Sequence, residues 1–459
     1  MGLAEVGSLG RVAPEVWAQV GERFREIGFH GGCVQTLPGA AGQFALEWMT
    51  LDAEAPALLA VRLLVLRQAL EEERVRVVLG EALFREAARG GLLVRDAGGG
   101  GWRFPFRLEL VNQLYVLCDP VSDEAAAVMT VGGTTQLLAR AGYPQQDVES
   151  ALDVGCGSGV LALLLAGAAR RVVGTDINPR AIAMARFNAA LNGVENVEFR
   201  EGDLYEPVAG ERFDLILAQP PFYARAGSMA DVRYLHGGRL GDEIAMGILA
   251  GARTHLRDGG VAVMLADLPV TGTPTGERLR ACVREGLMLV VTLDEQVTAA
   301  TVSTYFGWFG AEAGERATGR AREMYKHMRA MGIEAVEQMV VMVRADGDGC
   351  CELRAPRDGW DKLHRVHLDR AAALVRLGDR ELAALRLAWG QDCRVVARVD
   401  GGGRELWAAA EEAWLGAMAV SEEEWAALAG AVRGERAAAG ELVRRALLYG
   451  VARVDRQFN

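Results

Sequence analysis

A glycine-rich turn after a short apolar run restricts the fold of this chain more than any other feature. The run covers residues 151–154 (ALDV) and the turn covers residues 155–159 (GCGSG). Residues 160–169 then follow with an apolar pattern typical of a buried helix. Glycine lets the backbone bend tightly and lets a ligand approach the start of the next helix closely. The order strand, glycine turn, helix therefore predicts an α/β domain with a ligand-binding site at this turn.

Three further apolar segments each end in a polar position. The segments are 171–174, 197–199 and 213–218, and the polar positions after them are Asp176, Asp203 and Gln219. Asp176 follows the glycines by about 20 residues, the distance at which nucleoside-binding folds place a carboxylate for ribose hydroxyls. Ligands in open α/β sheets bind beyond the carboxyl ends of the strands, so we expect these polar groups to share one site.

Taken together, these motifs resemble the class I S-adenosylmethionine-dependent methyltransferases. The glycines at 155, 157 and 159 have the spacing of that family rather than the GxGxxG of dinucleotide enzymes, so NAD binding stays only a minor alternative. The Gln-Pro-Pro-Phe segment, residues 219–222, is similar to the Asn-Pro-Pro-aromatic motif of the protein-glutamine and ribosomal-RNA N-methyltransferases. The resemblance implies an α/β fold with a seven-stranded doubly wound, Rossmann-like sheet, whose seventh strand, 337–344, is antiparallel.

The resemblance also implies that S-adenosyl-L-methionine is the cofactor. Asp153 and the backbone around Gly155 and Gly157 would hold its amino-acid end, and Asp176 would take the ribose hydroxyls. Ile177, Asp203 and the Leu204 amide would contact its adenine. Thr134 would touch the methionine end, although a helix N-cap made by Thr134 or Thr135 is an equal alternative. The predicted cofactor-binding residues are Asp153, Gly155, Cys156, Gly157, Gly159, Asp176, Ile177, Asp203, Leu204, Gln219 and Thr134.

Residues of the Pro-Pro segment are the predicted catalytic residues. In the related N-methyltransferases the polar side chain and the first proline carbonyl accept hydrogen bonds from the target N–H2, and the aromatic ring packs on the substrate. Gln219 replaces the Asn and is one methylene longer, and a misplacement of ~1 Å can cost ~10²-fold in rate. We therefore expect a differently shaped acceptor, a small molecule or biosynthetic intermediate methylated on nitrogen rather than oxygen. The predicted catalytic residues are Gln219, Pro220, Phe222 and Tyr223, and the predicted substrate residues are Tyr115 and His236.

Other roles for two of these residues, and two other kinds of enzyme, are also compatible with the sequence. Gln219 could contact only the cofactor, and His236 could be a proton acceptor or a structural histidine. A non-methylating enzyme would close an azetidine ring or transfer an aminocarboxypropyl group, and would release methylthioadenosine. An RNA or protein N-methyltransferase is the other alternative.

Composition limits the partners. A formal net charge of -11 disfavours nucleic acid, and no apolar run reaches the ~18–20 residues that span a bilayer, so no membrane contact is expected. The seven cysteines lack zinc-site spacing, and no metal is predicted. The expected partner is a small-molecule substrate, with a homodimer left open. The absence of a signal-peptide pattern and the scattered cysteines favour a cytoplasmic location.

We expect three domains. Residues 1–112 show the order helix, helix, hairpin, which indicates a helical, winged-helix-like cap; DNA binding is the alternative, but the hairpin has few basic residues. Residues 113–346 form the catalytic domain, and residues 347–459 form a mostly helical extension, with helices expected at 380–389 and 405–418. Within the catalytic domain, residues 307–331 form a helical insertion with a basic face, either solvated or available to an acidic partner.

Overall fold

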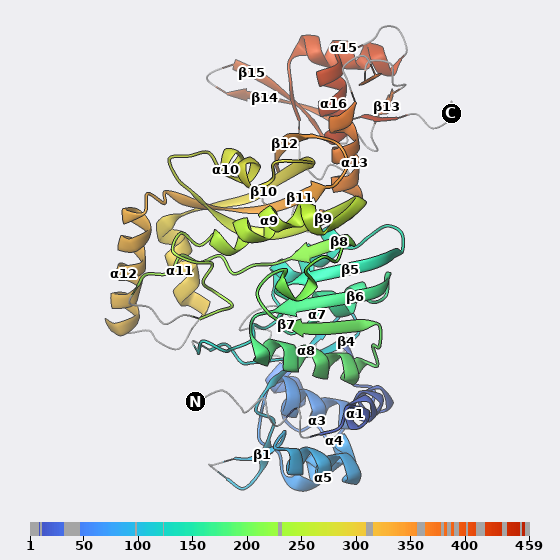
Figure 1. Cartoon of the computed structure of the whole chain (residues 1–459), viewed down its shortest axis with the longest axis vertical. Coiled ribbons are helices and arrows are strands. Elements are labelled where there is room, and N and C mark those ends of the chain that lie inside the picture. Colours follow the sequence, from blue (N-terminus) through green and yellow to red (C-terminus); the bar gives the residue numbers. More distant parts are fainter. Residues whose placement is uncertain are drawn as a thin grey trace.

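The computed structural model describes most of the chain and shows a central sheet between an N-terminal helical region and a C-terminal region (Figure 1). Within the described part of the chain, no helix is long and apolar enough to cross a membrane. The described residues are 9, 12–31, 46–96, 99–122, 124–227, 232–308, 315–355, 363–377, 381–382, 387–389, 394–400, 403–409, 418–433, 438–449 and 452–454.

The central sheet has eight strands in the order β12-β10-β11-β9-β8-β5-β6-β7. Their bounds are β5 (Val148–Val154), β6 (Ala169–Asp176), β7 (Val197–Glu201), β8 (Phe213–Ala218), β9 (Leu256–Val270), β10 (Leu287–Val297), β11 (Ala335–Arg344) and β12 (Gly349–Arg354). Only β11 is antiparallel to its neighbours, β9 and β10, as predicted for the seventh strand. The predicted count of seven is wrong, because β12 adds an eighth strand parallel to β10. The expected domain boundary at residue 346 therefore falls before the sheet is complete.

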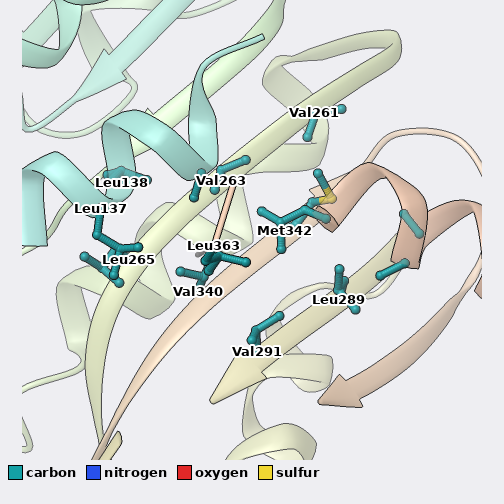
Figure 2. Close-up of a cluster of buried hydrophobic side chains, with 14 of the residues drawn as sticks. Leu137, Leu138, Val261, Val263, Leu265, Leu289, Val291, Val340, Met342 and Leu363 are labelled. Atoms are coloured by element: carbon teal, nitrogen blue, oxygen red, sulfur yellow. The ribbon is translucent and has the colours of Figure 1, made fainter. Parts of the chain in front are cut away.

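Helices cover both faces of this sheet. One face packs against α6 (Gly133–Gly142), α7 (Val160–Leu165), α8 (Pro179–Asn192) and α13 (Arg365–Arg376), and the other against α9 (Glu243–His255) and α10 (Thr275–Cys282). Val263 and Leu265 alternate along β9 and lie on the face that meets Leu137 and Leu138 of α6 (Figure 2). The apolar runs of the central strands are thus buried on two sides, which is typical of sheets built mainly from parallel strands.

An N-terminal module lies against the outer side of α8 (Figure 1). It contains α1 (Pro14–Glu26), α3 (Pro56–Ala60), the π-helix η3 (Val61–Val65), α4 (Glu72–Leu79), α5 (Glu81–Gly90) and the hairpins β1 (Val94–Arg95)–β2 (Trp102–Arg103) and β3 (Arg107–Val111)–β4 (Leu114–Cys118). The expected boundary after residue 112 lies in the turn between β3 and β4. Because the two strands are hydrogen-bonded to each other, the N-terminal module extends beyond that position.

Two asparagines of α8, one helical turn apart, fasten this module to the sheet domain. Asn188 Oδ1 accepts from the Leu117 amide at 2.7 Å, and its Nδ2 donates to the carbonyls of Leu117 at 3.0 Å and Ser158 at 2.9 Å. Asn192 repeats the pattern on Tyr115, with its Oδ1 at 2.9 Å from the amide and its Nδ2 at 2.8 Å from the carbonyl. The two side chains therefore satisfy the free edge of β4 as a neighbouring strand would.

The C-terminal region is less helical than predicted. It contains α13, α15 (Glu422–Val432) and α16 (Gly440–Leu448), together with the short strands β13 (Leu387–Trp389), β14 (Arg394–Asp400), β15 (Gly403–Ala409), β16 (Met418–Val420) and β17 (Ala452–Val454). Strands occupy residues 387–389 and 405–409, which lie within the helices expected at 380–389 and 405–418, whereas residues 381 and 382 are helical. In the second segment, β15 pairs with both β14 and β16, so strand pairing outweighs the helical preference of its Glu, Leu and Ala residues.

A helical insertion joins the antiparallel strands β10 and β11. It contains α11 (Thr298–Trp308) and α12 (Glu315–Ala330), which lie together at one edge of the molecule (Figure 1). Met324 and Met328 of α12 are buried with Tyr305 of α11 and Tyr223, which follows β8. The insertion therefore packs directly on the loop that carries the Pro-Pro segment.

Strand β5 ends near a buried carboxyl group. Asp153 is 1% exposed, and its Oδ2 accepts a hydrogen bond from the Ala162 amide of α7 at 3.1 Å. Burial raises the pKa of Asp153 to about 7, although the hydrogen bond from Ala162 acts in the opposite direction. The side chain consequently holds a proton over much of the range in which an exposed carboxyl has lost it.

We expect the Asn188→Ala variant to lose about 2–4 kcal/mol of the free energy of unfolding, because the buried backbone groups of Leu117 and Ser158 lose their partner. Urea unfolding followed by circular dichroism would measure the loss. Asn196→Ala is the matched control: Asn196 also bonds to two carbonyls, those of Ala166 and Ala169, but it is exposed, so water replaces it. Equal losses in the two variants would contradict the assigned role of Asn188.

The raised pKa of Asp153 predicts a stability that depends on pH. An unfolded Asp titrates near ~4, so above this pH the folded state retains a proton that the unfolded state has lost. This contribution is complete below about pH 4 and is lost as the pH rises through about 7. In the Asp153→Asn variant, the free energy of unfolding should decline less steeply between about pH 4 and pH 7 than in the wild type. Parallel pH profiles for the two proteins would refute the assignment.

Candidate active site

A cavity of about 360 Å³ lies at the carboxyl ends of β5, β6 and β8. Its size suits a small organic molecule, and its position is the one at which open α/β sheets bind ligands. Most of its lining residues come from five stretches that are far apart in the sequence. These stretches are residues 127–131, 154–158, 175–178, 203–204 and 219–222.

The glycine turn forms the floor of this cavity. Gly155 and Gly157 have φ values of 74° and 54°, in the left-handed region, and an added Cβ on either would meet no atom within 4 Å. The turn therefore leaves open space on the ligand side. Cys156 lines the same wall, and its amide donates to the Thr175 carbonyl at 2.9 Å. Gly159 does not line the cavity: a Cβ there would lie 2.9 Å from Ala185 Cβ and from Phe199, so this glycine serves packing within the domain.

Asp176 lies at the end of β6 and joins the glycine turn to α8. Its Oδ2 accepts from the Gly157 amide and its Oδ1 from the Asn178 amide, both at 2.8 Å. Burial raises the pKa of Asp176, while these two hydrogen bonds and the nearby Arg233 oppose the rise. Ile177, which is 54% exposed, forms the rim beside it. The predicted positions of both residues at the cavity are therefore observed.

Asp203 and Leu204 form the opposite wall, after β7. Leu204 has a φ of 45°, and its carbonyl accepts from the Thr175 hydroxyl at 2.9 Å. This hydrogen bond ties the turn after β7 to the end of β6. A carboxylate and a backbone amide are thus held next to an apolar wall that includes Ile248 of α9.

Two predicted cofactor residues lie behind the cavity wall. Asp153 is buried under the glycine turn and is not among the lining residues. Thr134 is also outside the lining, and its hydroxyl accepts from Gln219 Nε2 at 2.7 Å. The alternative of an N-cap at this helix start is wrong, because Gly132 is the capping residue of α6 and no side chain caps it. The Thr134 hydroxyl instead accepts the hydrogen bond that orients the Gln219 side chain.

The Pro-Pro segment contributes Gln219, Pro220 and Phe222 to the cavity wall. Tyr223 differs from the prediction: it is 5% exposed, lies outside the lining, and packs edge-on against Tyr305 with ring centres 4.9 Å apart. Burial raises the pKa of the Tyr223 hydroxyl. Three of the four predicted catalytic residues therefore meet at the site, and Tyr223 supports them from behind.

The two predicted substrate residues have structural contacts. His236 lines the cavity, but its Nδ1 accepts from the Val232 amide at 3.1 Å, and its Nε2 donates to the Tyr305 hydroxyl at 3.2 Å. Both ring nitrogens are engaged within the protein, so the structural alternative for His236 holds. Tyr115 belongs to β4, where it is buried and donates to the Phe29 carbonyl at 2.7 Å. The substrate role predicted for Tyr115 is wrong, because this side chain lies in the core of the N-terminal module.

Several lining residues were not predicted. Asn178 follows Asp176, caps α8 through its side chain and donates to the Ala126 carbonyl, which holds the segment over the cavity. An Asn before a Pro at a helix start is an N-cap signal, so the sequence contained the information. Arg233 and Tyr234 line the rim from the loop after Tyr223, and no local pattern marks them.

Part of this chain is similar to known methyltransferases. The sequence model of the family described as Methyltransferase small domain matches residues 130–282. A release factor glutamine methyltransferase of Xylella fastidiosa (strain 9a5c) is 36% identical over 155 residues, which cover 31% of this chain and 54% of that protein. A putative protein N5-glutamine methyltransferase of Methanocaldococcus jannaschii is 38% identical over 119 residues, covering 25% of this chain and 59% of that protein.

A third relative is named for RNA. The ribosomal RNA small subunit methyltransferase C of Alcanivorax borkumensis is 29% identical over 136 residues, covering 30% of this chain and 38% of that protein. The chain thus spans little more than half the length of the first two relatives and less of the third. The prediction of a small-molecule partner with nucleic acid disfavoured is wrong, because these relatives are named for proteins and for RNA.

The cavity fits the cofactor of this family. The open glycine turn, the Asp176 carboxylate and the apolar side chains of Ile177 and Leu204 suit a nucleoside with a charged amino-acid end. The matched segment, residues 130–282, contains the glycine turn, Asp176, Asp203 and the Pro-Pro segment. The match to this family and to the relatives therefore supports a methyltransferase activity for this segment, with S-adenosylmethionine as the cofactor.

Proposed function

We propose that this chain transfers a methyl group from S-adenosylmethionine to the side-chain amide nitrogen of a glutamine in a protein. The observation that carries the proposal is Gln219-Pro220-Pro221-Phe222 lining the cavity, with the Gln219 amide fixed by Thr134. The names of the relatives from Xylella fastidiosa and Methanocaldococcus jannaschii, both glutamine methyltransferases, support the same acceptor.

In this proposal the chain binds the acceptor amide by hydrogen bonds. Gln219 donates its Nε2 to Thr134, so its Oε1 is the atom available to accept from the target N–H2. The Pro220 carbonyl accepts the second N–H, and the Phe222 ring packs on the flat amide. These contacts turn the nitrogen toward the methyl donor, and such alignment supplies much of the rate of an in-line transfer.

The hydrogen bond to Thr134 also restrains the Gln219 side chain, which is one methylene longer than the Asn of the related enzymes. A free Gln would have one more rotatable bond than Asn and would place its oxygen less reproducibly. Anchoring Nε2 at 2.7 Å from Thr134 removes that freedom before the acceptor arrives. A planar glutamine amide thus remains a compatible acceptor despite the change from Asn.

The cofactor, when bound, supplies an electrophilic methyl carbon. Asp176 would accept from the ribose hydroxyls, Ile177 would contact the adenine ring, and Asp203 with the Leu204 amide would bind the adenine edge. Transfer of the methyl group leaves a positive charge on the amide nitrogen, and this cationic amide is strongly acidic. Its proton leaves to solvent, because both nitrogens of His236 are engaged within the protein.

The N-terminal module is proposed to be a winged-helix-like cap. Its order supports this: α3 and η3, an isolated bridge between Leu70 and Trp102, then α4, α5 and the β1–β2 hairpin. In this proposal the hairpin is the wing, and Leu70 pairs with its second strand through a single bridge.

We expect the full chain to methylate glutamine when incubated with S-adenosylmethionine and a release factor or a ribosomal-protein mixture. Mass spectrometry should find one added methylene on a glutamine and S-adenosylhomocysteine as by-product. The Gln219→Leu variant should lose ~10²-fold in kcat, because it cannot accept from the amide. Methylthioadenosine instead of S-adenosylhomocysteine, or methyl groups only on RNA, would overturn the proposal.

Thr134 provides the matched control for this test. Thr134→Ser keeps the hydroxyl and should keep near wild-type kcat, whereas Thr134→Val has the same shape without an acceptor for Gln219 Nε2. The Val variant should lose kcat while the KM for the cofactor stays unchanged, since Thr134 lies outside the cavity lining. Equal kcat values in the Ser and Val variants would contradict the positioning role.

The Asp176→Ala variant should bind S-adenosylhomocysteine about 1–3 kcal/mol more weakly, because charged hydrogen bonds to the ribose are lost. Isothermal titration calorimetry would measure the affinity without any acceptor. Asp147→Ala, a change at an exposed carboxyl outside the cavity, is the control and should leave the affinity unchanged. An unaltered affinity in Asp176→Ala would remove this residue from the ribose site.

A further inference from the structure

Helix α12 carries three cations and an aromatic ring on one exposed face. Arg322, Tyr325, Lys326 and Arg329 have the spacing i, i+3, i+4 and i+7, which brings side chains to the same side of a helix. All four are exposed, and Tyr325 is 41% exposed. We call these four residues the α12 basic face. Met324 and Met328, on the opposite side of the helix, are buried.

In the described part of the chain, the cations of the α12 basic face have no counter-ions. Among the residues that the structure describes, none forms a salt bridge or a side-chain hydrogen bond with Arg322, Lys326 or Arg329, and α11 next to them has no charged residue. Elsewhere many arginines are paired, as Arg200 is with Glu198 and Glu211. In a chain with a net charge of -11, this is a local concentration of unneutralised positive charge.

Helix α12 also lies next to the acceptor side of the site. Met324 and Met328 pack in the same cluster as Tyr223 and Leu235, which flank the Pro-Pro segment, and α12 is the outermost element at that edge (Figure 1). An α-helix with its side chains is about 10–12 Å thick, so a ligand on the outer face would lie one helix diameter from that loop.

We propose that the α12 basic face binds RNA, with Arg322, Lys326 and Arg329 contacting phosphates and Tyr325 stacking on an unpaired base. Cations supply the phosphate contacts that dominate nucleic-acid affinity, and exposed aromatic rings provide the stacking that single strands use. An acidic protein would match the charges equally well but would leave Tyr325 without a role. This inference goes beyond the proposed function and does not depend on which group is methylated.

The test uses the full chain and a fluorescein-labelled single-stranded RNA of about 20 nucleotides, longer than the ~4–16 nucleotides that such sites cover. Fluorescence anisotropy at several salt concentrations should show binding that weakens with salt. The triple variant Arg322→Glu, Lys326→Glu, Arg329→Glu should bind at least about ten-fold more weakly. Its slope of log affinity against log salt should be shallower by about 2, because three phosphate contacts are removed. Tyr325→Ala should weaken binding about five-fold or more.

A matched control distinguishes a specific role of the α12 basic face from a general effect of net charge on RNA binding. Arg25, Arg284 and Arg370 are exposed, have no ion pair among the described residues, and lie on α1, after α10 and on α13. Replacing these three by Glu changes the net charge by the same amount and should leave RNA binding within about two-fold of wild type. Thermal unfolding verifies that each variant is folded, and a milder triple change of the α12 cations to Gln replaces the Glu variant if that one fails.

Three results would overturn the proposal. The first is the absence of RNA binding by the wild-type chain at low salt, and the second is an equal loss in the α12 and control triple variants. The third is tighter binding of poly-glutamate than of RNA with the same dependence on the α12 cations, which would assign the face to an acidic protein.

Discussion

The buried amide of Asn188 holds three parts of the molecule together. It bonds to the edge strand β4 of the N-terminal module and to the carbonyl of Ser158 in the glycine turn, while its own helix packs on the sheet. Its neighbour Asn192 extends the contact along β4. The position of the cofactor turn is thus tied directly to the N-terminal module. Because the Asn188 amide and its partners at Leu117 and Ser158 are buried, the loss of any one of the three parts would leave buried polar groups unpaired.

The catalytic half of the fold could be predicted from local sequence because each strand there ends in a recognisable signal. The glycine turn, Asp176, Asp203 and the Pro-Pro segment all lie at the carboxyl edge of the sheet and line one cavity. The antiparallel strand β11 was implied by the resemblance to the methyltransferase family. Side-chain direction was harder to predict: Asp153 and Thr134 lie at the right ends of their elements but point behind the wall.

Predictions that depend on contacts between distant segments were less successful. Strand β12 joins β10 across more than fifty residues, and β15 occupies part of a segment that has helical composition. Tyr115 and His236 resembled binding residues, yet their partners, the Phe29 carbonyl and Tyr305, come from other regions of the chain. Such partners cannot be predicted from the local sequence around Tyr115 or His236. Tertiary pairing decided these positions rather than intrinsic preference.

The insertion between β10 and β11 has a further consequence. These two strands are antiparallel neighbours that are hydrogen-bonded over most of their length. Their pairing in the sheet therefore does not depend on which segment connects their ends. The connecting helices nevertheless reach the acceptor loop through Tyr305 and His236. Lengthening or exchanging this one connection would reshape the entrance on the acceptor side and leave the nucleoside pocket intact. Such a scaffold can diversify its targets through a single exchangeable segment while its donor chemistry remains constant.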